Sequence, residues 1–152
     1  METPGDSGPI VAHVATDGED ALVLTGRPAA FDVLLARDGA PIDDGEEAVA
    51  AARTHQDLTR PSDRYGQVVD APGDVRLRTD VDDAERRDLE AALEGVVVPP
   101  EAHADGDRWL VTLTYLDGDV LERRQVAVGT GGPVEVVAVD VLRSDLPVPF
   151  SL

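Results

Sequence analysis

The clearest pattern in the chain is the alternation of apolar and polar residues over residues 109–116. Such alternation predicts a β-strand with one buried face. An Asp-Gly turn follows, and residues 120–128 lead the chain back as the second strand of a hairpin. After a second turn over residues 129–133, residues 134–142 are almost wholly apolar, which predicts a central strand covered on both faces. We therefore expect a three-strand antiparallel meander in the C-terminal part of the chain.

The N-terminal half predicts another hairpin and several shorter extended pieces. Apolar runs over residues 10–15 and 21–25 flank an Asp-Gly turn. Residues 31–37 are ambiguous, because every second residue is apolar, as in a strand, while adjacent Ala and Leu pairs suit a short helix. The Asp-Gly pair directly after this segment favours the strand. Short extended segments are also expected at residues 67–69 and 75–78.

Two segments carry the signals of a helix N-terminus. The first is the Ala-rich run over residues 45–58, which Asp44 can cap with its carboxylate. The second covers residues 82–94, where Asp82 and Glu85 have the spacing of a capping box. We expect one helix in each segment.

The remaining segments read as irregular, and together with the elements above they define the fold class. Residues 1–9 are rich in Gly and Pro and predict a flexible tail, while residues 59–73 and 99–106 predict loops. The Pro-interrupted end of the chain, from residue 145, is also expected to be irregular. The sequence thus predicts a single α+β domain over residues 10–152, in which about two helices cover an antiparallel sheet made of the N-terminal hairpin and the C-terminal meander.

Composition excludes several classes of protein. The absence of Cys excludes a disulfide framework, a thiolate nucleophile and Cys-ligated metal sites. No apolar run approaches the roughly 18 residues of a membrane-spanning helix. The N-terminus lacks the basic and apolar regions of a secretory signal, so we expect a cytoplasmic protein without membrane contact.

The charge balance is strongly acidic. The chain holds 31 Asp and Glu residues against 13 Arg and no Lys, a net charge of −18. This excess of carboxylates repels itself in dilute buffer and is screened in molar salt. The composition resembles that of proteins from halophiles that keep molar salt in the cytoplasm; an acidic protein from a GC-rich mesophile is the alternative. Nucleic acid is an unlikely partner for such a surface.

The segment from Arg53 to Arg64 departs from this acidic background. It also contains His55 and Arg60, and Tyr65 follows directly. Guanidinium groups can clamp a carboxylate or phosphate through two hydrogen bonds, and His can exchange a proton near neutral pH. These five residues are our candidate site for an anionic ligand. The alternative is that the arginines pair with nearby acids and hold a long loop in place.

Other motifs give no site. His13 and His103 are interpreted as structural, and the Gly-rich residues 129–132 lack the Lys-Ser/Thr ending and the following helix of a phosphate loop. The acidic runs over residues 43–47 and 80–85 are explained by helix caps and a solvated surface, because neither matches a calcium loop. No Ser lies in a nucleophile-elbow motif. We therefore expect no metal and no cofactor, and the sequence assigns no catalytic residue.

These observations favour a non-enzymatic protein that acts through a protein partner or as a regulatory accessory factor. Enzymatic activity is left open. The first alternative is a small-molecule-binding domain or enzyme that uses the Arg53–Arg64 segment, and the second is nucleic-acid binding. Trp109 and Tyr115 share one strand face; they belong to the core, or to a partner surface if that face is open. The sequence does not determine the oligomeric state.

The acid excess predicts that the protein is less stable in dilute salt. We expect the melting temperature to fall as KCl drops below ~0.5 M, because repulsion between carboxylates is then less screened. Thermal unfolding followed by circular dichroism from low to molar KCl measures this dependence. A melting temperature that stays flat over the series contradicts the halophile interpretation.

Overall fold

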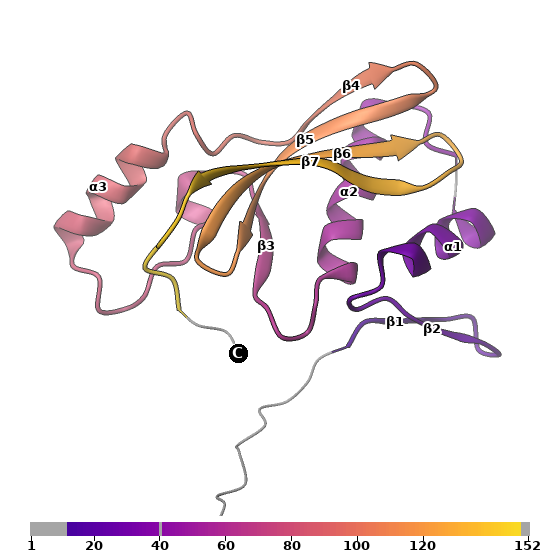
Figure 1. Ribbon diagram of the computed structural model, residues 1–152, viewed down its shortest axis with the longest axis horizontal. Coiled ribbons are helices and arrows are strands. Elements are labelled where there is room, and N and C mark those ends of the chain that lie inside the picture. Colours follow the sequence, from indigo (N-terminus) through magenta and orange to yellow (C-terminus); the bar gives the residue numbers. More distant parts are fainter. Residues whose placement is uncertain (1–11, 40, 150–152) are drawn as a thin grey trace, which may run out of the picture.

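The centre of the structure is an antiparallel sheet (Figure 1). The computed structural model describes residues 12–39 and 41–149, so the predicted tail over residues 1–9 lies outside the described part. Within that part the sheet has five strands, with β3 and β4 both beside β5, followed by β6 and then β7. The strands are β3 (Gly66–Val69), β4 (Glu101–Asp105), β5 (Arg108–Asp117), β6 (Val120–Gly129) and β7 (Val134–Arg143).

The predicted C-terminal meander is confirmed, but β7 is an edge strand. β5, β6 and β7 pair in succession, and a two-residue turn that starts at Gly118 joins the first two. The prediction of a central strand over residues 134–142 was wrong, because β6 is its only neighbour in the described part of the chain. The apolar run shows that the residues favour a strand, but it does not reveal where that strand lies in the sheet.

Two further predictions on extended segments were wrong. Residues 99–106, expected to be a loop, contain β4, which pairs with the first half of β5 through partners such as Ala102 and Val111. This pairing provides hydrogen-bond partners for the backbone groups of β5. It forms although the residues of β4 have a low strand propensity. Residues 75–78, expected to be a strand, are irregular. Their apolar side chains are nevertheless buried, and the Arg78 backbone N–H donates to the Pro147 carbonyl.

Three α-helices lie in the described part: α1 (Pro28–Asp38), α2 (Gly45–Thr59) and α3 (Asp83–Leu93), with a short 3-10 turn over Pro72–Asp74. The two predicted helices are confirmed together with their caps. Asp44 accepts a hydrogen bond from the Glu47 backbone N–H at 2.9 Å. Asp82 accepts from two backbone N–H groups in the first turn of α3. None of the described helices is both long and apolar enough to cross a membrane.

Helix α1 replaces the strand expected over residues 31–37. Pro28 stands at its first turn, where the fixed φ of proline suits a helix. Phe31 is buried and Leu34 and Leu35 are half-buried, which is helical spacing, whereas Val33 is exposed. The apolar residues of this segment fit both the spacing of a strand and the spacing of a helix. Packing against α2 selects the helix.

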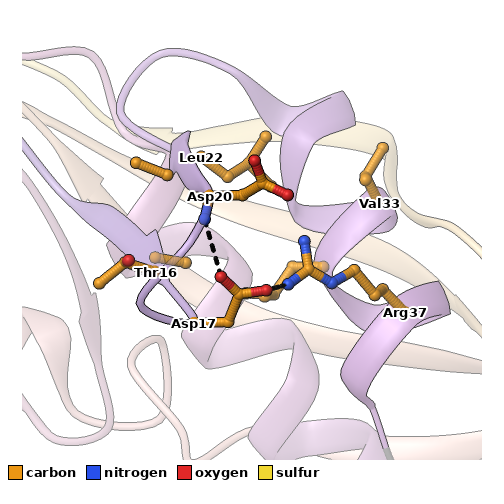
Figure 2. Close-up of a pocket in the computed structure, with 9 residues that line it drawn as sticks. Thr16, Asp17, Asp20, Leu22, Val33 and Arg37 are labelled. Carbon is orange, nitrogen blue, oxygen red and sulfur yellow. Dashed lines mark hydrogen bonds and ion pairs between the residues drawn. The ribbon is translucent and has the colours of Figure 1, made fainter.

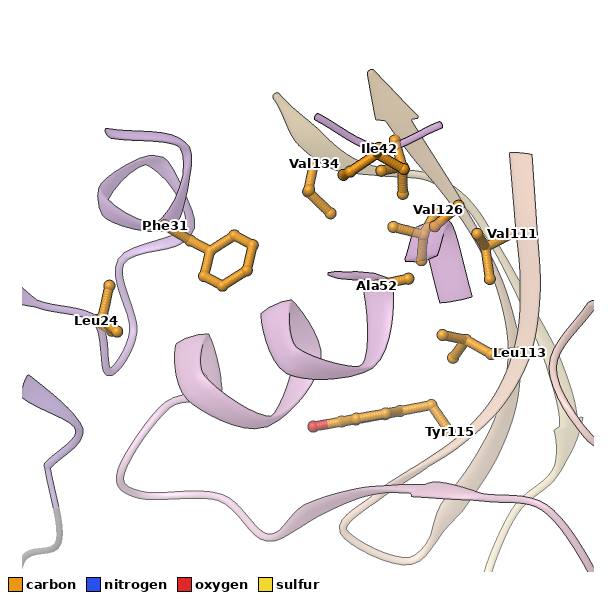
Figure 3. Packing of buried hydrophobic residues seen from close by; sticks show 11 residues of the cluster. Leu24, Phe31, Ile42, Ala52, Val111, Leu113, Tyr115, Val126 and Val134 are labelled. Atoms are coloured by element: carbon orange, nitrogen blue, oxygen red, sulfur yellow. The ribbon is translucent and has the colours of Figure 1, made fainter. Parts of the chain in front are cut away.

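The sheet separates two hydrophobic cores. On one face, α1 and α2 pack over side chains of β5, β6 and β7 (Figure 3); the buried set includes Phe31, Ala48, Ala52, Val111, Leu113, Tyr115, Val126 and Val134. On the other face, α3 packs over Val69, Leu116 and Leu121. Tyr115 and Leu116 are consecutive and therefore belong to opposite faces. Tyr115 is thus in the core, and Trp109 packs against the same cluster.

The predicted N-terminal hairpin is confirmed for its described residues, β1 (Val14–Thr16) and β2 (Ala21–Val23). It forms a two-stranded sheet of its own beside α1 and does not extend the main sheet (Figure 1). The last described residues, from 145 to 149, contain no helix or strand, as expected.

Candidate functional site

The five candidate residues lie at the end of α2 and in the connection to β3. Arg53 and His55 are in the helix, and Arg60 is its C-terminal cap. Arg64 and Tyr65 follow in the short loop before β3. The candidate segment is therefore half helix, and its members point in different directions from the helix axis.

The three arginines of the candidate segment contact the protein itself. Arg53 Nη2 donates to both carboxylate oxygens of Asp70 at 2.6 Å. Arg60 Nη1 donates to the Gly66 carbonyl at 2.9 Å, and Arg64 Nε lies 3.1 Å from Asp117 Oδ1. These contacts attach the segment to β3 and to the end of β5, as the loop-holding interpretation expects. Ligand binding by the segment stays a prediction.

His55 is buried and separate from those arginines. Its ring lies edge-on to Phe31, with 5.3 Å between ring centroids. Gln56 Nε2 lies 3.0 Å from His55 Nδ1, and because an amide nitrogen only donates, Nδ1 accepts and the neutral ring carries its proton on Nε2. Nε2 has no hydrogen-bond partner among the described residues. Burial lowers the pKa of His55 most; Asp32 opposes this and Arg124 adds to it.

Tyr65, the fifth candidate, donates its hydroxyl hydrogen to Gln67 Oε1. The five candidates therefore do not converge on one point. The structure connects Arg64 to a different group of charges, which the sequence analysis did not identify.

That group surrounds Arg124 on β6. Arg124 Nε donates to Glu122 Oε2 at 2.8 Å, and Nη1 donates to Gln56 Oε1 at 2.7 Å. Nη2 lies 3.4 Å from Asp117 Oδ2, and the guanidinium carbon stands 3.8 Å from the centroid of the Tyr115 ring. Burial, more than any neighbouring charge, raises the pKa of Tyr115. We call Arg124, Glu122, Asp117, Gln56 and Tyr115 the Arg124 cluster.

The Arg124 cluster joins α2, β5 and β6 at the edge of the first core. Its charged side chains are 13–19% exposed, so water screens them only in part. The sequence signal for it was the position of Arg124, which shares a strand face with the buried Val126 and Val128. A charged side chain on an inward face needs an opposite charge or a hydrogen-bond partner. Because those partners include residues of other elements, the sequence of the strand alone could not predict them.

Several hollows lie on the described surface. One of about 290 Å³ lies between the N-terminal hairpin and α1 (Figure 2), where Asp17 and Arg37 form an ion pair. A more open groove of about 840 Å³ runs between α2 and β4 and includes Arg53 and Ala102. Among the described residues, no three His, Asp or Glu side chains are grouped so as to hold a metal ion.

The most unusual surface is the outer edge of β7. Val137, Val139 and Val141 are exposed by 44%, 49% and 62%. At the start of the strand, the Val134 backbone N–H donates to Asp32 Oδ1 at 2.8 Å, so a side chain of α1 closes that end. Beyond it, no described strand pairs with the edge. We call the outward side of β7 from Glu135 to Arg143 the β7 edge.

Comparison with protein-family models, curated proteins and solved structures finds no match for this chain. We therefore infer a function from the geometry of the described residues, above all from the β7 edge.

The Arg124 cluster predicts a large stability loss on removal of its cation. Arg124→Gln leaves Glu122 half-buried with no compensating charge and leaves Asp117 with Arg64 alone, so the free energy of unfolding should fall by about 2–4 kcal/mol. Arg108→Gln is the matched control, because Arg108 pairs with Asp105 where both side chains are about half exposed. It should cost less than about 1 kcal/mol. Urea unfolding in molar KCl measures both; equal losses would contradict a special role for the cluster.

The buried imidazole predicts a decline of stability on acidification. The pKa of His55 is lowered in the folded state, so below its ordinary value of 6.5 the unfolded chain binds the proton more readily. The free energy of unfolding should therefore decrease from pH 7.5 to 5.5, by at most about 1.4 kcal/mol per pH unit. His55→Gln should flatten this slope. His103→Gln, at an exposed position, is the control, and a slope unaffected by His55→Gln contradicts the prediction.

Proposed function

We propose that this protein is a non-enzymatic interaction protein whose β7 edge pairs with a strand of another polypeptide chain. The observation that carries the proposal is a ten-residue edge strand with three exposed valines and no described strand on its outer side. A strand that binds at such an edge gains backbone hydrogen bonds and covers apolar side chains. Regulation of the bound partner is one use of such a contact.

The opposite edge of the sheet supports this assignment by contrast. There β4 exposes Glu101, His103 and Asp105, and charged side chains of this kind discourage strand pairing. β3 is only four residues long, and Arg60 already donates to its Gly66 carbonyl. The exposed side chains of β4 named here are all polar, whereas the β7 edge presents three valines among its charged residues.

The alternative functions have less support. An anionic ligand at the candidate segment would compete with Asp70, Asp117 and the Gly66 carbonyl for the arginines. Nucleic-acid binding is opposed by the net charge of −18, since phosphate contacts require positive surface. Both remain hypotheses for which the structure provides no favouring contact.

Affinity capture with matched edge variants tests the proposal. Tagged wild-type protein, Val139→Lys and Val98→Lys serve as baits in an extract of the source cells at molar KCl. Val98 is a suitable control because it is exposed by 40% and lies outside the sheet. We expect at least one protein, which can be an untagged copy of this chain, to be retained near stoichiometrically by wild type and Val98→Lys. It should be lost from Val139→Lys, because a Lys at the centre of the edge places a charge in the contact.

Quantitative mass spectrometry of the three eluates gives the result. If all three baits retain the same proteins, or none retains any, the β7 edge is not an interaction surface and the proposal fails.

A further inference from the structure

We infer that the strand bound at the β7 edge is β7 of a second copy of this chain, paired antiparallel about a two-fold axis at Val139. This inference rests on the proposed function of the β7 edge and adds the identity of its partner. Three features of β7 carry it: the spacing of its valines, the direction of its backbone groups and the placement of its charges.

The valines of β7 are placed symmetrically about Val139 once the register irregularities of the strand are counted. Val137 and Leu142 have no register partner in β6, so Val136 and Val141 fall two β6 positions on either side of Val139. Antiparallel pairing about Val139 therefore places Val139 opposite its own counterpart, and Val136 opposite Val141 of the second copy. The six valines of the two copies then cover one another, and apolar area that now faces water is buried. β-branched side chains are also favourable cross-strand pairs.

The direction of the backbone groups fits the same register. Asp117 and Val120 flank a two-residue turn and form a hydrogen-bonded pair, so alternate residues of β6 after Val120 bond to β5 and the others to β7. Arg123 and Gln125 are among those that face β7, where their partners are Asp140 and Ala138.

It follows that Val139 and Val141, which alternate with Asp140 and Ala138, turn their N–H and C=O groups away from β6. Val139 and Val141 thus combine outward backbone groups with exposed apolar side chains, and Val136, opposite Val126 of β6, turns its backbone groups outward by the same alternation. Val134, at the start of the strand, is consistent with this pattern, since its N–H leaves the sheet to reach Asp32.

The charges of β7 are self-complementary about the same point. Glu135 and Arg143 lie opposite Ala127 and Leu121, three β6 positions on either side of Val139, so the axis places each Glu135 opposite Arg143 of the other copy. Both β6 partners lie on the same face of the sheet. Both charged residues are exposed, and among the described residues neither has an ion pair. Asp140 faces Ala138 in this register, so no like charges meet.

A two-fold contact of this kind is closed. Each copy uses its β7 edge once, and the edges left at the two ends of the joined sheet are the charged β4 and the short β3. A dimer therefore forms without further growth into a fibre.

Disulfide trapping tests the register, because the chain contains no native Cys. Only a residue on the axis meets its own copy, and the Cα atoms of a hydrogen-bonded antiparallel pair are about 5.5 Å apart. This separation lies within the roughly 4.4–6.8 Å that a disulfide spans. Under oxidation in molar KCl, Val139→Cys should become a covalent dimer, whereas Val98→Cys and Val136→Cys alone should not. The pair Val136→Cys with Val141→Cys should cross-link again.

The mass in solution tests the association itself. Light scattering in molar KCl should give wild type and Val98→Lys twice the 16.1 kDa chain mass, and Val139→Lys the mass of the monomer. Two Lys residues facing each other should raise the dissociation constant by at least about 100-fold. Glu135→Arg should raise it by about tenfold, and combination with Arg143→Glu should reverse that loss.

The outcomes separate the two proposals. A monomeric wild type overturns the inference, as does a dimer that Val139→Lys leaves intact or that Val139→Cys does not trap. If a monomeric wild type still captures another protein in a way that depends on Val139, the proposed function stands and only the second copy is excluded. If it captures none, both fail.

Discussion

Strand β5 is the element on which the rest of the structure depends. It pairs with β6 on one side along its whole length and with β3 and β4 on the other. Its side chains alternate between the core under α2 and the core under α3, as Tyr115 and Leu116 show. A one-residue slip of β5 would exchange the two sets of side chains and empty both cores, so the fold has a single register.

The Arg124 cluster fixes the same register through polar contacts. Arg124 lies where the apolar face of β6 ends, and its guanidinium meets acids from β5 and β6 and an amide from α2. Asp117 also receives Arg64, so the connection after α2 is tied to the same place. In the described structure, the arginine-rich segment links α2 to β3 and β5 through its contacts with Asp70, the Gly66 carbonyl and Asp117.

Charge and apolar surface have opposite effects on association. Two copies that each carry −18 repel one another in dilute salt, but at ~1 M salt the Debye length is about 3 Å and the repulsion is confined to close contacts. Apolar contacts are less affected by this screening. The salt that would stabilise so acidic a chain would therefore also allow a valine-rich edge to find a partner.

The sequence determined the elements whose signals are local. Caps at Asp44 and Asp82 defined two helices, and alternation around the turn at Gly118 defined the β5–β6 hairpin, because capping bonds and pleat alternation involve only neighbouring residues.

Only the tertiary structure decided the rest. The residues after Pro28 fit the spacing of a strand as well as that of a helix, and packing against α2 decides for the helix. Residues 101–105 form a strand because their backbone pairs with that of β5. The contacts of the candidate arginines were decided in the same way, since the partners of Arg53 and Arg64 lie on other elements. An apolar run such as residues 134–142 has the same sequence pattern in a central strand and in an edge strand. Its position depends on which other strands are present, and that is a property of the whole chain.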